Sequence, residues 1–231
     1  MSQLFIVATP LGNTSDISAR ALDTLASVDL ILAEDTRVTR NLLTKYPGRQ
    51  FKAEVFRLDE HIRGERLDQL ADRIAAGQSA AMVSSAGTPQ VSDPGESIVE
   101  ACVARGVTIV PVPGASALAT ILSVANFVAE PTAFVGFLPK KKGRQTMLES
   151  IKTASGKHGL QAMVLYESPY HVLRTFAELA ERFGADTKVV VGRELTKHFE
   201  EVWYGTVTDA ITHFAKPKGE FTLLVQTVTP R

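Results

Sequence analysis

The 231-residue chain carries 25 Lys and Arg against 25 Asp and Glu, so its formal net charge is zero. A protein that binds RNA through its overall field usually has a basic surplus, and this balance excludes that mode of binding. The single cysteine, Cys102, excludes an internal disulfide and is expected in the core. Apolar runs fall short of the roughly 20 residues that span a bilayer, and the N-terminus lacks a basic leader, so we expect a cytoplasmic protein without a membrane segment.

Short apolar runs alternate with helical periodicity throughout the first half of the chain. We expect strands at 4–8, 28–33, 54–58, 80–83 and 107–110, and helices at 16–26, 38–45, 63–76 and 96–105. Strands that alternate with helices are typical of a mainly parallel sheet covered on both faces. The first half therefore predicts an α/β domain.

A Val-Pro-Val-Pro-Gly segment at 110–114 interrupts this alternation, and we place a domain boundary there. The predicted domains are residues 1–112 and 113–231. In the second domain we expect helices at 115–128, 146–153, 170–182 and 209–214, and strands at 134–137, 162–166, 188–192, 202–206 and 221–228. Strands follow strands more often here, which favours a mixed sheet with antiparallel pairs.

Three loops that follow predicted strands, at 9–13, 84–95 and 111–116, are rich in Gly, Pro and small hydroxylated residues. Such loops leave backbone groups accessible, and α/β proteins bind ligands at the carboxyl ends of their strands. We interpret the three together as a ligand site, although each alone could be an ordinary turn. The Gly-rich dinucleotide and phosphate-loop fingerprints are missing from the sequence, and its five histidines form no ligand set for a metal.

Nine short motifs in register carry a resemblance to a known family. They are Ala-Thr-Pro-Leu-Gly-Asn at 8–13, Ala-Glu-Asp-Thr-Arg at 33–37, Ala-Gly-Thr-Pro at 86–89, Ser-Asp-Pro-Gly at 92–95, Val-Pro-Gly-Ala at 112–115, Gly-Phe-Leu-Pro-Lys at 136–140, Tyr-Glu-Ser-Pro at 166–169, Arg-Glu-Leu-Thr-Lys at 193–197 and Lys-Gly-Glu at 218–220. In order and spacing the chain resembles the ribosomal RNA small subunit methyltransferase I family, from about residue 4 to residue 228.

The resemblance implies a two-domain tetrapyrrole-methylase (class III methyltransferase) fold, usually a homodimer, with S-adenosylmethionine held between the domains. The implied activity is 2′-O-methylation of a cytidine in 16S rRNA of the small ribosomal subunit, and no metal is implied. The cofactor-binding positions carried over from the family are Pro10, Ser84, Ser85, Ala86, Gly87, Thr88, Gly114, Ser116, Ala117, Tyr166 and Glu194.

The chain departs from the family in two places. The family usually has Asp where this chain has Ser85, so a fixed negative charge is lost at that position. Family members also often continue past the final strand into a C-terminal extension, whereas this sequence ends at Arg231. The first departure is expected to weaken cofactor binding or turnover.

Methyl transfer to a ribose hydroxyl needs close alignment of donor and acceptor, and a nearby base assists this weak nucleophile. Glu167, Asp35 and Glu194 are the candidate bases, and Arg193 is a candidate catalytic cation that could also hold a phosphate. Arg37 could hold a phosphate in a bidentate manner. An ion pair, for example between Asp35 and Arg37, is the alternative interpretation for each of these groups.

A run of cations after the strand at 134–137 is the candidate RNA contact. Its members are Lys140, Lys141, Lys142 and Arg144. They lie in the half of the chain that carries the basic surplus, since residues 1–117 have a net charge of −3 and residues 118–231 one of +3. Cations in a loop can bind RNA phosphates, but an ordinary solvated loop is the alternative.

Two other functions remain open from the sequence. A methylase of a tetrapyrrole precursor or another small substrate would suit the zero net charge. A cofactor-binding, ribosome-associated protein without turnover would be consistent with Ser85.

Overall fold

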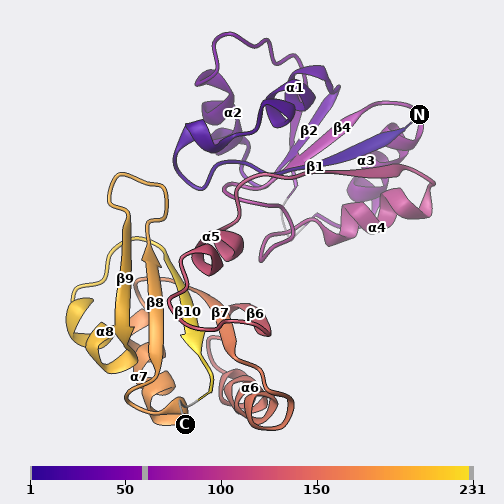
Figure 1. Cartoon of the computed structure of the whole chain (residues 1–231). Coiled ribbons are helices and arrows are strands. Elements are labelled where there is room, and N and C mark those ends of the chain that lie inside the picture. Colours follow the sequence, from indigo (N-terminus) through magenta and orange to yellow (C-terminus); the bar gives the residue numbers. More distant parts are fainter. Residues whose placement is uncertain (1, 59–61, 229–231) are drawn as a thin grey trace. The chain divides into compact units, whose positions relative to one another are not determined.

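The computed structural model describes residues 2–58 and 62–228. The chain divides into two compact units, Met1–Ser116 and Ala117–Arg231 (Figure 1). Strand β5, Thr108–Val112, runs through Pro111, although the sequence predicted that this strand ends at 110. Proline is tolerated here because β5 is an edge strand, on which a missing N–H need not disturb the ladder.

The first unit contains a five-stranded sheet in the order β3-β2-β4-β1-β5, and every neighbouring pair is parallel. The other strands are β1 Gln3–Val7, β2 Leu30–Ala33, β3 Glu54–Arg57 and β4 Ala80–Val83. The helices are the short 3-10 turn η1 Thr14–Asp16, α1 Ala19–Ser27, α2 Thr36–Thr44, α3 Glu65–Ala75 and α4 Glu96–Ala104. The predicted parallel α/β arrangement is confirmed.

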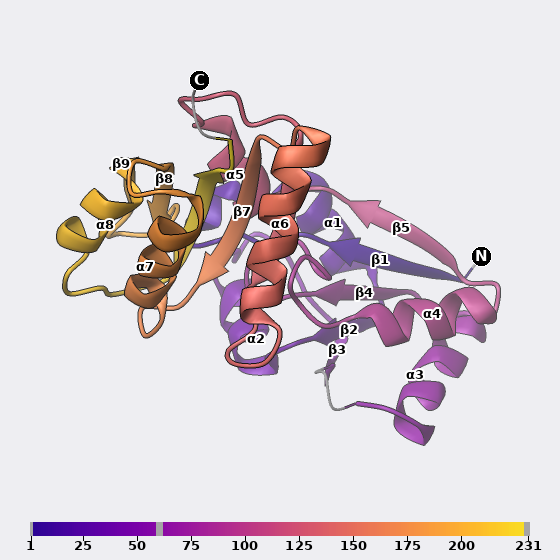
Figure 2. The same cartoon turned by 90° about the horizontal axis from the view of Figure 1, so that it is seen from below.

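Strand β2 shows why the apolar runs of this unit have no polar alternation. Leu30 and Leu32 pack into a cluster with α3 and α4, whereas Ile31 and Ala33 pack into a second cluster with α1 on the opposite face. Successive side chains of a strand point to opposite faces, so a strand covered on both faces must be apolar at every position. Figure 2 shows α3 and α4 side by side along their face of the sheet.

Cys102 is fully buried in α4, and burial raises the pKa of its thiol to about 11. It therefore stays protonated and packs as a small apolar residue, as expected. Among the helices of residues 2–58 and 62–228, none is long and apolar enough to cross a membrane.

The second unit contains a mixed sheet, as the sequence predicted. Its strand order is β6-β7-β10-β8-β9. Only the β6–β7 pair is parallel among these neighbours. The strands are β6 Thr132–Phe137, β7 Ala162–Glu167, β8 Lys188–Arg193, β9 Glu201–Thr206 and β10 Phe221–Gln226. The helices are α5 Ala117–Ser123, α6 Arg144–His158, α7 Val172–Phe183 and α8 Val207–His213.

Helices cover both faces of this second sheet as well. Leu148 of α6, Phe176 of α7 and Ala210 of α8 pack on one face, and Ile121 of α5 packs on the other. Helix α6 begins at Arg144 and is far longer than the predicted segment at 146–153. This start places Arg144 in the first turn of a packed helix rather than in a loop.

Candidate functional site

The three Gly- and Pro-rich loops of the first unit lie at one edge of its sheet, because they follow the neighbouring parallel strands β4, β1 and β5. Thr9 and Gly87 form an antiparallel bridge with N···O distances of 2.8 and 3.0 Å. The hydroxyl of Thr88 donates to the carbonyl oxygen of Ala115 at 3.0 Å. The loops at 9–13, 84–95 and 111–116 are therefore bonded into one assembly.

Small residues shape the surface of this assembly. Gly87 has a φ of +80°, and a Cβ there would lie 3.2 Å from the side chain of Leu11. The hydroxyl of the buried Ser84 donates back to the Gly87 carbonyl at 3.1 Å. Ala86 and Gly114 are exposed, so backbone is accessible beside them. This surface fits a ligand recognised mainly through backbone groups.

Two carboxylates that were not among the predicted site residues belong to this part of the unit: Glu34 follows β2, and Asp93 lies within the loop at 84–95. Glu34 accepts a hydrogen bond from the backbone N–H of Ser85 at 2.9 Å. Burial, and next the charge of Glu34, raise the pKa of Asp93 to about 6, against a hydrogen bond with Ser84 that lowers it. Ser85 has no carboxylate of its own, but the Glu34 carboxylate lies against its backbone N–H. Both residues occur in the quoted motifs at 33–37 and 92–95, which was the available signal.

Asp35 is the N-cap of α2. Its carboxylate accepts from the backbone N–H of Arg37 at 2.8 Å and of Val38 at 3.3 Å. The Arg37 guanidinium lies 3.2 Å from it, and its hydrogen bond is the largest cause that lowers the pKa of Asp35 to about 2. A carboxylate with so low a pKa is a poor general base near neutral pH. The ion pair considered as the alternative is present.

The motifs at 193–197 and 218–220 meet in the second unit. Glu194 accepts from the backbone N–H of Glu220 at 2.9 Å, and Lys197 bridges the two carboxylates. A Cβ on Gly219 would overlap the Glu194 side chain, which explains the glycine. Arg193 pairs with Glu201 at 3.1 Å. Thus Glu194 and Arg193, assigned to cofactor and catalysis from the resemblance, both have structural partners in their own unit.

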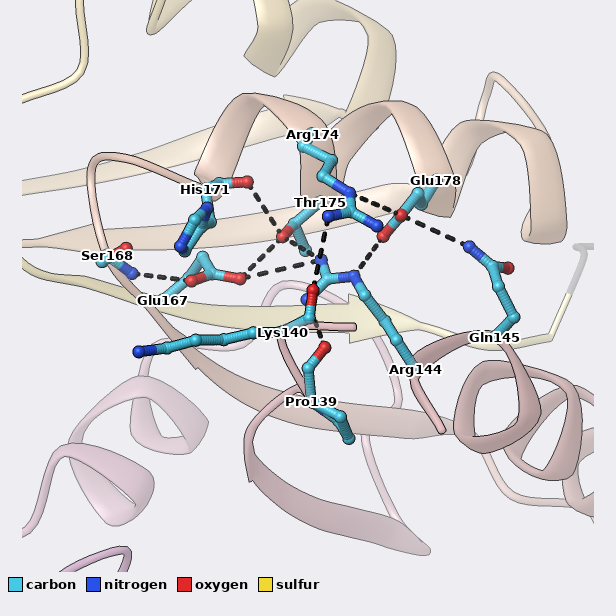
Figure 3. A network of polar contacts seen from close by, with 10 residues as sticks. All are labelled: Pro139, Lys140, Arg144, Gln145, Glu167, Ser168, His171, Arg174, Thr175 and Glu178. Atoms are coloured by element: carbon cyan, nitrogen blue, oxygen red, sulfur yellow. Dashed lines mark hydrogen bonds and ion pairs between the residues drawn. The ribbon is translucent and has the colours of Figure 1, made fainter. Parts of the chain in front are cut away.

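Arg144 corrects the expectation of an RNA-binding cation. Its side chain is 4% exposed, and its Nε donates to Glu178 Oε2 at 2.5 Å (Figure 3). Its Nη2 donates to the hydroxyl of Thr175 at 2.6 Å and lies 3.8 Å from Glu167 Oε2. A guanidinium enclosed in this way is inaccessible to RNA. The physical reason is its place in α6, which packs against the sheet.

Glu167 belongs to the same network. It is 6% exposed and accepts from the backbone N–H of Ser168 at 2.8 Å and from the Thr175 hydroxyl at 2.7 Å. With Arg144 alongside, its charge is compensated inside the fold. These contacts assign Glu167 a structural role and leave it few free lone pairs for proton abstraction. Tyr166, which precedes it, makes edge-to-face contacts with Phe134 and Phe137 at 5.2 and 5.8 Å.

The remaining members of the basic run differ from Arg144. Lys140, Lys141 and Lys142 are exposed. The other expected cofactor positions are placed as follows: Pro10 is buried after β1, Ser116 is half-buried at the end of the first unit, and Ala117 begins α5. Among the described residues there is no group of three or more His, Cys, Asp or Glu that could hold a metal ion.

Comparison with known proteins defines the class of this fold. The sequence model of the Tetrapyrrole (Corrin/Porphyrin) Methylases matches residues 3–211. Uroporphyrin-III-C-methyltransferase of Thermus thermophilus superposes with a TM-score of 0.65 at 18% identity, over 98% of this chain and 95% of that one. Cobalt precorrin-4 methyltransferase superposes with a TM-score of 0.67 at 22% identity, over 99% and 97%. At these identities the likeness shows the fold, and the predicted tetrapyrrole-methylase class is confirmed.

Sequence relatives narrow this class to a family. The Ribosomal RNA small subunit methyltransferase I of Synechocystis sp. is 40% identical over all of this chain and 81% of its own length. The protein of the same name from Thermotoga maritima is 40% identical over 97% of this chain and 98% of its own. The chain belongs to the ribosomal RNA small subunit methyltransferase I family. It is an S-adenosylmethionine-dependent methyltransferase, as the resemblance implied.

The buried network predicts a large stability difference between two arginines on neighbouring helices. Arg144→Met leaves the buried Glu167 without its cation and leaves Glu178 paired with Arg174 alone, and we expect a loss of about 3–5 kcal/mol in the free energy of unfolding. Arg182→Met removes a more exposed pair with Glu149 and should cost at most about 1 kcal/mol. Urea denaturation of both variants measures this difference, and equal losses would contradict it.

The raised pKa of Asp93 predicts a pH dependence of stability. The folded state holds an extra proton between the ordinary pKa of 3.8 and the value of about 6. The free energy of unfolding contributed by Asp93 is therefore highest below 3.8 and declines as the pH rises through about 6. Asp93→Asn should remove this decline. Because the Asp93 side chain is only partly buried, we expect the free energy of unfolding of Asp93→Asn to exceed that of wild type by about 1 kcal/mol at pH 7. Denaturation curves of both proteins across this range are the measurement, and parallel pH profiles would contradict the assignment.

Proposed function

We propose that this chain transfers the methyl group of S-adenosylmethionine to the 2′-hydroxyl of a cytidine in 16S rRNA, in the cytoplasm and as a homodimer. The observation that carries the proposal is the 40% identity to proteins named Ribosomal RNA small subunit methyltransferase I over 97% or more of the chain. The structurally similar uroporphyrin-III and cobalt precorrin-4 methyltransferases share only 18% and 22% sequence identity with this chain. This structural likeness supports a small-substrate methylase only through the fold.

We assign the cofactor to the loop assembly that joins Thr9, Gly87, Thr88 and Ala115. Its exposed backbone and small side chains suit a nucleoside and an amino-acid moiety, which are recognised through N–H and C=O groups. The remaining positions carried over from the family, Gly114, Ser116, Ala117, Tyr166 and Glu194, stay predictions. When bound, S-adenosylmethionine supplies the methyl group on a sulfonium, from which the thioether of S-adenosylhomocysteine is a good leaving group. The chain's own task is then to hold donor and acceptor in line.

A glycine exchange tests this assignment. In Gly87→Val a β-branched residue must adopt a φ of +80°, and its Cβ approaches Leu11. We expect the affinity for S-adenosylhomocysteine to fall by at least about tenfold, because the backbone around the Thr9 bridge must move. Gly48→Val is the matched control, since a Cβ there meets nothing within 4 Å and φ is ordinary. Calorimetry at a temperature at which both variants are folded gives the comparison. Equal affinities would place the cofactor elsewhere.

The reaction itself is tested with methyl-labelled S-adenosylmethionine and small ribosomal subunits that lack the modification. We expect label in 16S rRNA. Alkaline cleavage of RNA requires a free 2′-hydroxyl, so label on the ribose should be recovered in an alkali-stable dinucleotide. Label in mononucleotides would mean base methylation, which would contradict the 2′-O assignment.

Two controls separate the alternatives. Uroporphyrinogen III offered in place of the subunit should remain unlabelled, and label on it would favour the small-substrate methylase. Binding of S-adenosylhomocysteine without transfer to either substrate would favour the non-catalytic protein.

A further inference from the structure

A cavity of about 460 Å³ opens in the second unit beside the Arg144 network. It lies where β6 and β7 end, and since these strands are parallel their following loops emerge at one edge. Two family motifs line it, through Phe137 and Lys140 after β6 and through Ser168 after β7. The volume falls in the range of cavities that hold small ligands or single nucleotides.

Two aromatic rings at this cavity are unusually exposed. Tyr170 is 90% exposed and Phe137 is 58% exposed. Phe137 also contacts Tyr166 edge-to-face. Exposed aromatic rings beside a hollow are what a flat ligand stacks on, and every nucleobase has such a face.

The charge at the cavity is positive after the internal pairs are taken into account. Glu167 lines the wall, but Arg144 and the Thr175 hydroxyl compensate it within the fold. Arg174 pairs with Glu178 and keeps 54% of its side chain exposed, and Lys140 is exposed at the rim. Arg144, Arg174 and Lys140 thus outnumber the carboxylates of Glu167 and Glu178 by a single positive charge, and a phosphate would meet Lys140 and the exposed part of Arg174.

Ser168 adds a polar group to the wall. Its Oγ is buried and has no hydrogen-bond partner among the described residues. A buried hydroxyl without a partner is costly, and Ser168 is one of the residues that line the cavity. Figure 3 shows Ser168, His171 and the Lys140 side chain gathered around Glu167.

We propose that this cavity binds one nucleotide of a single-stranded RNA segment, with the base stacked on Tyr170 and the phosphate held by Lys140 and Arg174. The inference rests on the proposed RNA substrate and adds the place where the second unit holds it. Single-stranded RNA is favoured over a duplex because stacking requires an unpaired base. The cavity thereby positions the RNA strand, and no catalytic step is assigned to it.

The test measures binding of a fluorescent, single-stranded, cytidine-containing oligoribonucleotide to the full chain by anisotropy. Tyr170→Ala should weaken binding about tenfold, whereas Tyr170→Phe, which keeps the ring, should stay within about twofold of wild type. Phe199→Ala is the matched control, because Phe199 is 66% exposed and does not line the cavity. It should leave the affinity unchanged.

Two neighbouring lysines test the phosphate contact. Lys140 lines the cavity, whereas Lys141 is equally exposed and does not. Lys140→Ala should lower the slope of log affinity against log salt by about 0.7, the value for one phosphate contact to a single strand. Lys141→Ala should leave that slope unchanged. Unlabelled cytidine monophosphate should compete with the oligonucleotide far better than inorganic phosphate.

Several outcomes overturn the proposal. They are undiminished binding by Tyr170→Ala, equal effects of Lys140→Ala and Lys141→Ala, and equal competition by inorganic phosphate, which would show an anion site only. The labelled-subunit assay separates this from the proposed function. If the wild-type protein methylates the subunit but every variant binds RNA as tightly as wild type, only the cavity proposal is rejected. If the cavity variants selectively lose RNA binding but the wild-type protein transfers no methyl group, only the proposed reaction is rejected.

Discussion

Both candidate sites depend on parallel pairing of neighbouring strands. Parallel strands end at the same edge of a sheet, so loops far apart in the sequence meet there. In the first unit this constraint joins Thr9 after β1 to Gly87 after β4. In the second unit, only β6 and β7 pair in parallel among the strands described, and the cavity with Phe137 and Tyr170 lies at their ends.

The Arg144 network links fold and binding surface in the second unit. Burying Glu167 and Glu178 would be prohibitive without a cation, and a buried arginine would be equally costly without them. With Arg174, which also pairs with Glu178, they form a nearly neutral wall between α6, α7 and β7. Because their charges are compensated inside, the exposed Lys140 can determine the sign of the field at the cavity. Zero net charge is thus compatible with a local cationic site.

Much of the fold followed from the sequence, because apolar runs and glycine stops mark buried strands and helix ends. The run at 30–33 is apolar at each position, which a doubly covered strand requires. The strand through Pro111 was missed because it depends on pairing with β1, and the 3-10 turn before α1, which Asn13 caps locally, was missed as well. The site was less predictable. A run of cations does not reveal that helix α6 begins at Arg144 and turns that side chain inward, because burial depends on the packing partners and not on local composition.

Carboxylates illustrate how local geometry divides residues of one type into different chemical roles. Asp35 sits at a helix N-terminus beside a guanidinium, and its pKa is lowered to about 2. Asp93 lies partly buried near Glu34, and its pKa is raised to about 6. At neutral pH both are largely ionised, but only Asp93 changes protonation close to that pH. A proton released from a ribose hydroxyl needs an acceptor whose protonated form is stable near the working pH. The capping geometry of Asp35 and its ion pair with Arg37 keep its pKa far below that range, whereas partial burial brings the pKa of Asp93 into it.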